Sequence, residues 1–154
     1  QMGYRFDAPA SPHHAAALEE KECSLESMVE WSSTLDRASP YLIEGAGGAL
    51  VPLNSKQLLI EFPIQMGWPI LIVASSKLGG INHTLMTVEA LASRNANILG
   101  IVSVGDDDPS YNSALQSHSI VKHLSHIPHC NEPFIANALD YGQALSQAIL
   151  DKLR

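Results

Sequence analysis

The sequence predicts a three-layer α/β domain with a mostly parallel sheet, because apolar strand-like runs alternate with helical patterns along the chain. The clearest run covers 69–74, which is continuous and β-branched, as expected of a strand buried on both faces. Similar runs predict strands near 41–44 and 98–104. A doubly wound sheet usually has about 5 or 6 strands, so we expect this sheet to need N-terminal strands that the chain does not supply.

The composition indicates one globular domain spanning residues 1–154 and excludes several classes of protein. Apolar residues make up 45% of the 154 residues and charged residues 16%, which is typical of a packed domain. The net charge is −7 with scattered basic residues, so we expect no nucleic-acid partner. No apolar run is long enough to span a membrane. Cys23 and Cys130 form no close-spaced motif and indicate reduced thiols in a cytoplasmic protein.

Capping residues and helical spacing of apolar side chains predict the helices. Ser11 and Pro12 begin a helix of about two turns. Ser24 caps a second helix. A third is expected to be disturbed by Pro63 and closed by Gly67. Asp140 caps the last helix. After the first helix, the spacing of apolar residues therefore predicts helices at 24–37, 56–60, 81–94, 110–124 and 140–154.

The first candidate site lies where the predicted strand near 41–44 ends. Glu44 is followed by Gly45, Ala46, Gly47 and Gly48. Ligands of parallel sheets bind beyond the carboxyl ends of the strands, and small residues let a backbone approach a ligand closely. An acid beside phosphates is usually tolerated with a divalent cation between them, so Glu44 is a candidate Mg²⁺ ligand. The alternative is a tight turn with an exposed carboxylate, and the stretch alone leaves both open.

A second candidate site is the start of the helix after the strand at 69–74. Gly79, Gly80, Ile81 and Asn82 occupy this position. The free backbone N–H groups of a helix start suit a carboxylate or a phosphate. The alternative is a packing helix whose glycines serve only the turn.

Two further groups of polar residues suggest metal binding less strongly. The loop from Asp106 to Asp108 is acidic, but a solvated loop that caps the next helix is favoured. Histidines and a cysteine gather downstream, where a zinc site is one interpretation. Their spacing fits no closed zinc pattern, so the sequence leaves metal binding undecided for His118, His123, His126, His129 and Cys130.

Several segments together resemble the dethiobiotin synthetase family of P-loop enzymes. They are Ser-Pro-His at 11–13, Glu-Gly-Ala-Gly-Gly at 44–48 with Pro52, and Gly-Gly-Ile-Asn-His-Thr-Leu at 79–85 followed by Thr87 and Glu89. Their order and spacing fit the family over nearly the whole chain, and 80–91 is the most specific part. The acid-plus-glycine run also resembles amidoligases of the cobyrinic acid diamide synthetase type.

The chain departs from the family by having no G-x-x-x-x-G-K-[ST] phosphate loop. It also lacks the segment that would carry the family's catalytic lysine and second metal-binding aspartate. The resemblance therefore implies the C-terminal two-thirds of a P-loop NTPase-like domain, and it identifies no catalytic residue in this chain. We expect the isolated chain to be inactive without its phosphate loop.

The resemblance implies an ATP-dependent ligase of biotin biosynthesis, which forms a ureido ring from 7,8-diaminopelargonic acid, CO₂ and ATP with Mg²⁺. Glu44 would bind the metal, and Gly79, Gly80, Ile81 and Asn82 would hold the substrate, in a site completed across a homodimer. The nucleotide would lie against Glu44, Gly45, Ala46, Gly47, Val104, Gly105, Pro128, His129 and Cys130.

Two other functions stay open from the sequence. The chain could be a non-catalytic dimerisation and substrate-binding half, an interpretation that the missing phosphate loop favours for the isolated polypeptide. It could also be a related P-loop amidoligase with another substrate, although the run Asn82-His83-Thr84 matches the biotin enzyme better.

Overall fold

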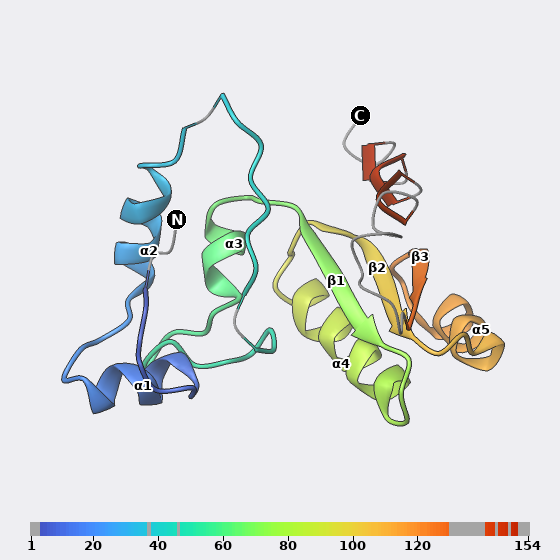
Figure 1. Cartoon of the computed structure of the whole chain (residues 1–154), viewed down its shortest axis with the longest axis horizontal. Helices are drawn as coiled ribbons and strands as arrows, with labels where there is room; N and C mark the ends of the chain where they lie inside the picture. Colours follow the sequence, from blue (N-terminus) through green and yellow to red (C-terminus); the bar gives the residue numbers. More distant parts are fainter. Residues whose placement is uncertain are drawn as a thin grey trace. The chain divides into compact units, whose positions relative to one another are not determined.

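The computed structural model describes residues 4–36, 38–45, 47–129, 141–143, 145–147 and 149–150. The chain forms two compact units, residues 1–68 and residues 69–154, and each is described here by itself. No helix in the described ranges has the length and apolar character needed to cross a membrane. The elements in chain order (Figure 1) are α1 (Pro12–Leu18), α2 (Leu25–Ser32), α3 (Glu61–Gln65), β1 (Ile70–Ser75), α4 (Gly80–Ala92), β2 (Ile98–Gly105), α5 (Pro109–His118) and β3 (His123–Pro128).

The first unit is built from short helices around a small core. Ala16, Cys23 and Leu53 are buried at its centre, and the side chains packed against them are Tyr4, Phe6, Met28 and Leu59. The predicted helix starts are confirmed, because α1 begins at Pro12 and the Ser24 hydroxyl accepts a hydrogen bond from the Ser27 amide.

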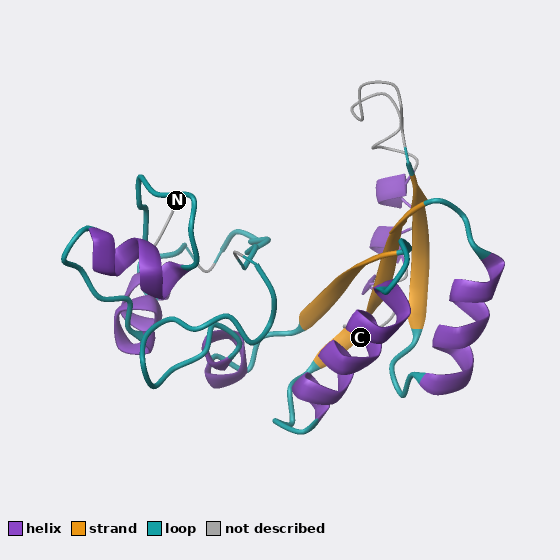
Figure 2. Cartoon of the chain, turned by 90° about the horizontal axis from the view of Figure 1, so that it is seen from below, coloured by secondary structure: helices purple, strands orange, loops and turns teal. Residues whose placement is uncertain are grey.

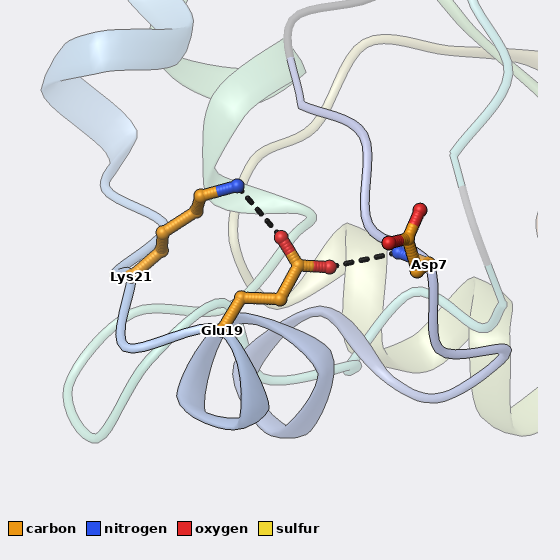
Figure 3. A network of polar contacts seen from close by, with 3 residues as sticks. All are labelled: Asp7, Glu19 and Lys21. Atoms are coloured by element: carbon orange, nitrogen blue, oxygen red, sulfur yellow. Dashed lines mark hydrogen bonds and ion pairs between the residues drawn. The ribbon is translucent and has the colours of Figure 1, made fainter.

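At the surface, Glu19 at the end of α1 forms polar contacts with the segment before the helix and with Lys21 after it. The Glu19 carboxylate accepts a hydrogen bond of 2.8 Å from the Asp7 amide and contacts the Lys21 ammonium group at 2.6 Å (Figure 3). These hydrogen bonds, from Lys21 first and then from the Asp7 backbone, lower the pKa of Glu19. Ion pairs of this kind at a surface contribute little to stability, so the contact orients the segment more than it stabilises the unit.

The predicted helix at 56–60 is wrong, and Asn54 explains the difference. Its side-chain oxygen accepts hydrogen bonds from the amides of Lys56 and Gln57, which offers the backbone an alternative to helical bonding. The helix forms later as α3, and Pro63 lies inside it. Gly67 follows this helix with a φ of 66°, as the predicted helix end required.

The predicted strand near 41–44 is also wrong. Residues 41–45 have no regular secondary structure, and 96% of the Leu42 surface is exposed. A strand forms only where a neighbouring strand accepts its backbone hydrogen bonds, and none of the described residues pairs with this segment. The preceding helix ends at Ser32, earlier than the expected residue 37, where the hydroxyls of Ser32 and Ser33 both donate to the Val29 carbonyl.

The second unit contains a sheet, whose strands are orange in Figure 2. The strands are parallel in the order β1-β2-β3, which confirms the predicted α/β class. The strands at 69–74 and 98–104 were predicted, and β1 and β2 confirm them. On β1, Ile72 and Ala74 are buried, whereas 68% of Val73 is exposed. The prediction that this strand is buried on both faces is therefore wrong, because one face of β1 lies open among the described residues.

The helices α4 and α5 pack against each other, α4 against β1 and α5 against β3. The α4 prediction of 81–94 matches the observed Gly80–Ala92 closely. The predicted helix at 110–124 is too long, since α5 ends at His118 and β3 follows. Within the range predicted for the last helix, residues 141–143, 145–147 and 149–150 are helical. Its predicted cap, Asp140, lies outside the described residues.

Candidate functional site

The predicted site residues of the second unit meet at the carboxyl edge of its sheet. In the register of the parallel strands, Val104 pairs with Ser75 of β1, and Gly105 pairs with Pro128 of β3. The His129 amide donates a hydrogen bond of 3.1 Å to the Gly105 carbonyl oxygen. Residues from 104–105 and 128–129 therefore lie together at the edge where parallel sheets bind ligands.

The start of α4 lies at this same edge, and two glycines allow the helix to approach the end of β1 closely. Gly79 precedes the helix with a φ of 87°, a conformation that other residues rarely adopt. A side chain on Gly80 would collide with the carbonyl oxygen of Ser75, and the Tyr111 ring lies at 3.3 Å from the same position. The glycines thus allow the first turn of α4 to rest directly on the end of β1.

Ser76 connects the loop after β1 to the loop after β2. Its amide donates a 3.0 Å hydrogen bond to the Val104 carbonyl, and its hydroxyl donates a 2.8 Å bond to the Asp106 carbonyl. Gly105, which has a φ of 131°, lies against the Ser76 side chain. The two loops that carry the predicted nucleotide and substrate residues therefore form one connected structure.

The first turn of α4 has the electrostatic character of an anion site. The Gly80 amide donates to the Lys77 carbonyl at 2.7 Å, while Ile81 and Asn82 follow at positions where a helix offers amides without intrahelical acceptors. The Asn82 side chain is exposed and its amide nitrogen lies 3.4 Å from the Met86 sulfur. The positive end of the helix dipole therefore faces this edge and suits a carboxylate.

The acidic loop caps α5, as the favoured interpretation expected. The Asp108 carboxylate accepts hydrogen bonds from the Ser110 hydroxyl and amide, and these bonds lower the pKa of Asp108. No group of three or more His, Cys, Asp or Glu side chains that could hold a metal occurs in the part of the chain that the structure describes. The histidine region thus gives no structural support to a zinc site, and Cys130 lies outside the described residues.

Two of those histidines instead form a partly buried polar cluster with Ser103, which the sequence did not reveal. The hydroxyl of Ser103, which is fully buried, lies 2.8 Å from His123 Nε2 and 2.9 Å from His126 Nδ1. Since a hydroxyl has a single proton, at least one imidazole donates its own N–H to Ser103. Burial, and to a smaller extent the neighbouring His126, lower the pKa of His123. His126 Nε2 is buried without a hydrogen-bond partner among the described residues.

The remaining predicted residues lie in the first unit. Glu44 is exposed, Gly45 lies against the Leu59 side chain, and Gly47 has a φ of 89°. Ala46 lies outside the described residues. An exposed carboxylate next to a glycine turn is compatible with both interpretations from the sequence, because Mg²⁺ at phosphates commonly takes only one or two protein carboxylates.

Comparison with known proteins shows which proteins this chain is similar to in sequence. The family model described as AAA domain matches residues 2–132. Three curated relatives are named ATP-dependent dethiobiotin synthetase BioD. The one from Paramagnetospirillum magneticum is 41% identical over 78% of this chain and 57% of its own length. Those from Anaeromyxobacter dehalogenans and Lysinibacillus sphaericus are 43% and 38% identical, over 70% and 77% of this chain and 50% and 54% of their own lengths. This chain therefore spans about half the length of the relatives it matches.

Proposed function

Because this chain belongs to the AAA domain family and is similar to dethiobiotin synthetases over most of its length, we propose that it belongs to an ATP-dependent dethiobiotin synthetase. One amine of 7,8-diaminopelargonic acid adds to CO₂ and forms a carbamate. The γ-phosphoryl group of ATP passes to the carbamate oxygen and leaves ADP. The second amine then attacks the carbonyl carbon, phosphate departs with its bonding electrons, and the ureido ring closes.

The observation that carries this proposal is the meeting of two predicted sites at one sheet edge. The start of α4, from Gly79 to Asn82, adjoins the loop that contains Val104 and Gly105 through the contacts of Ser76 and Ser75. A reaction between a bound amine and a nucleotide requires both ligands to be held side by side. The α4 amides would hold the substrate carboxylate, and the loop with Val104 and Gly105 would lie along the nucleotide.

Glu44 is the residue that we propose as a ligand of Mg²⁺. Its exposed carboxylate is a hard oxygen donor, and the glycines after it leave room for phosphate groups. When bound, the cation would neutralise charge on the phosphates. The chain's own contribution is to present this single carboxylate next to glycines, which carry no side chains of their own.

A homodimer and a cytoplasmic location belong to the same proposal. The α4 start is exposed at Asn82 and Met86, so a second copy has access to the residues next to the substrate site. We expect a symmetric dimer in which the same surface of each copy takes part. Sedimentation at micromolar concentration measures this, and a species of monomer mass alone would contradict it.

The reaction itself is tested with the whole protein to which these residues belong, including a phosphate loop, because we expect the chain without that loop to be inactive. The protein is mixed with 7,8-diaminopelargonic acid, ¹³C-bicarbonate and MgATP, and dethiobiotin and ADP are quantified together. We expect one ADP for each dethiobiotin and the label in the ureido carbonyl. Binding of diaminopelargonate without product would instead support a non-catalytic substrate-binding role, and neither binding nor product would overturn the proposal.

A further inference from the structure

We propose that Tyr111 of α5 and Thr84 of α4 act together as positioning residues that hold the first turn of α4 in place for the substrate. The inference rests on the proposed function, because it concerns the helix start that would bind 7,8-diaminopelargonic acid. Neither residue was a candidate from the sequence, and neither would touch the reacting atoms.

The hydrogen bonds around Thr84 have a defined direction. The Thr84 hydroxyl donates to the Gly80 carbonyl at 2.7 Å, and it lies 3.0 Å from the Tyr111 hydroxyl. A hydroxyl has one proton and two lone pairs, so Thr84 must accept the second bond and Tyr111 must donate it. A chain of bonds therefore runs from Tyr111 through Thr84 to the first residue of α4.

The Tyr111 ring also lies close to that first residue. Its ring carbon Cε2 lies 3.3 Å from the position that a Gly80 side chain would occupy. The same side chain would collide with the Ser75 carbonyl on the other side. The first turn of α4 is thus held between the end of β1 and the tyrosine ring, and the hydroxyl pair fixes the next turn.

Burial makes this pair sensitive to the loss of either partner. Tyr111 is 2% exposed and Thr84 is 3% exposed, so water cannot replace a missing hydroxyl without rearrangement. A small shift of the first turn moves the amides of Ile81 and Asn82 together. Since a carboxylate at a helix start depends on the direction of these amides, the shift weakens substrate binding.

The variants Tyr111→Phe and Thr84→Val each remove one hydroxyl and keep the approximate shape. We expect Tyr111→Phe to raise KM for diaminopelargonate about 3- to 10-fold, the range set by one lost hydrogen bond. We expect Thr84→Val, which loses two hydrogen bonds, to raise KM at least as much. We expect kcat to stay within about 2-fold, because the reacting atoms are untouched. The double variant should be no worse than about the larger single effect, since Thr84→Val already removes both bonds of its hydroxyl, including the one that Tyr111→Phe breaks. Thr84→Ser keeps the hydroxyl and should retain the wild-type KM.

Val88→Ala supplies the matched control for a general loosening of the helix. Val88 is buried one turn after Thr84 and is 3% exposed, so its truncation destabilises α4 without removing a hydroxyl. We expect Val88→Ala to lower the melting temperature but to leave KM unchanged.

The outcomes separate this inference from the proposed function. A wild-type protein that makes no dethiobiotin overturns the proposed function and the inference that rests on it. A wild-type protein that is active, with Tyr111→Phe and Thr84→Val at the wild-type KM, overturns the inference alone. An equal rise in KM in Val88→Ala also overturns it, because general packing would then explain the effect. If Thr84→Val does not fold, the KM of Tyr111→Phe compared with that of Val88→Ala still tests the inference.

Discussion

The Ser76 hydroxyl donates a hydrogen bond of 2.8 Å to the Asp106 carbonyl oxygen and so connects the loops after β1 and β2. A hydrogen bond of this kind contributes about 0.5–1.5 kcal/mol net to folding stability. We therefore expect Ser76→Ala to lower the free energy of unfolding by about 1 kcal/mol, measured by urea denaturation. Ser93→Ala is the control, since the exposed Ser93 hydroxyl donates to Ala90 in its own turn. If the two variants lose the same free energy of unfolding, the hydrogen bond between the loops contributes no more than an ordinary surface hydrogen bond.

Gly80 is the position where we expect the largest effect of a single methyl group. Its side chain would meet the backbone oxygen of Ser75, which cannot move aside as a flexible side chain could. We expect Gly80→Ala to destabilise the fold by about 3 kcal/mol, the upper range for overpacking. Gly142→Ala is the control, because Gly142 is helical with no atom within 4 Å of the added carbon, and it should gain up to about 1 kcal/mol. Thermal melts of both variants measure the difference, and a neutral Gly80→Ala would contradict the close contact.

The strands show which part of the fold the sequence could predict. The runs at 69–74 and 98–104 are apolar and β-branched, and β1 and β2 form there because each has a neighbour in the sheet. The run at 41–43 has the same local character but no strand pairs with it in the described residues. Pairing is a property of distant segments, so an apolar run alone could not distinguish these cases.

The third strand was missed for a different reason. Two histidines, His123 and His126, occupy positions where an apolar residue would have revealed the strand, and each forms a hydrogen bond with the buried Ser103. The edge residues Val104, Gly105 and Pro128 were nevertheless predicted, because the resemblance to a known family placed them without reference to β3. The local pattern of polar residues, in contrast, suggested a metal site that the described residues do not form.

The partly buried position of His123 predicts that the stability of the fold depends on pH. Burial lowers the pKa of this imidazole below its ordinary value of 6.5, so the folded protein binds fewer protons than the unfolded chain just below that value. The contribution to stability is therefore complete above about pH 6.5 and is lost as the pH falls through the lowered pKa. Urea unfolding from about pH 7.5 to about pH 5 measures the loss.

His123→Gln tests whether this residue causes the loss. The glutamine amide nitrogen can take the place of Nε2 beside Ser103 but does not titrate, so we expect a flatter stability profile. His118→Gln is the control, since His118 is exposed at the end of α5, and it should keep the wild-type profile. A wild-type slope that persists in His123→Gln would assign the effect to another group.

Glu44 is tested through activity and magnesium together. Because the side chain is exposed, Glu44→Gln should change the free energy of unfolding by less than about 0.5 kcal/mol. If the carboxylate binds Mg²⁺, its loss should lower kcat at least about 10-fold and raise the Mg²⁺ concentration needed for half-maximal rate. Glu30→Gln, an exposed substitution on α2, is the control and should leave both values unchanged. An unchanged Mg²⁺ dependence in Glu44→Gln would leave this residue as part of a turn.

The last prediction concerns the nucleotide base. At the edge proposed for it, Val104 has no polar side-chain atom and Gly105 has no side chain. The backbone there is largely occupied, because the Val104 carbonyl accepts from the Ser76 amide and the Gly105 carbonyl accepts from the His129 amide. A site rejects a wrong base strongly only when its own polar groups would be left unpaired. We therefore expect kcat/KM for ATP, GTP and CTP, measured at one Mg²⁺ concentration, to agree within about 100-fold, or about 2.7 kcal/mol at 1.36 kcal/mol for each factor of ten. A larger preference for ATP would mean that a polar group other than these backbone atoms recognises adenine.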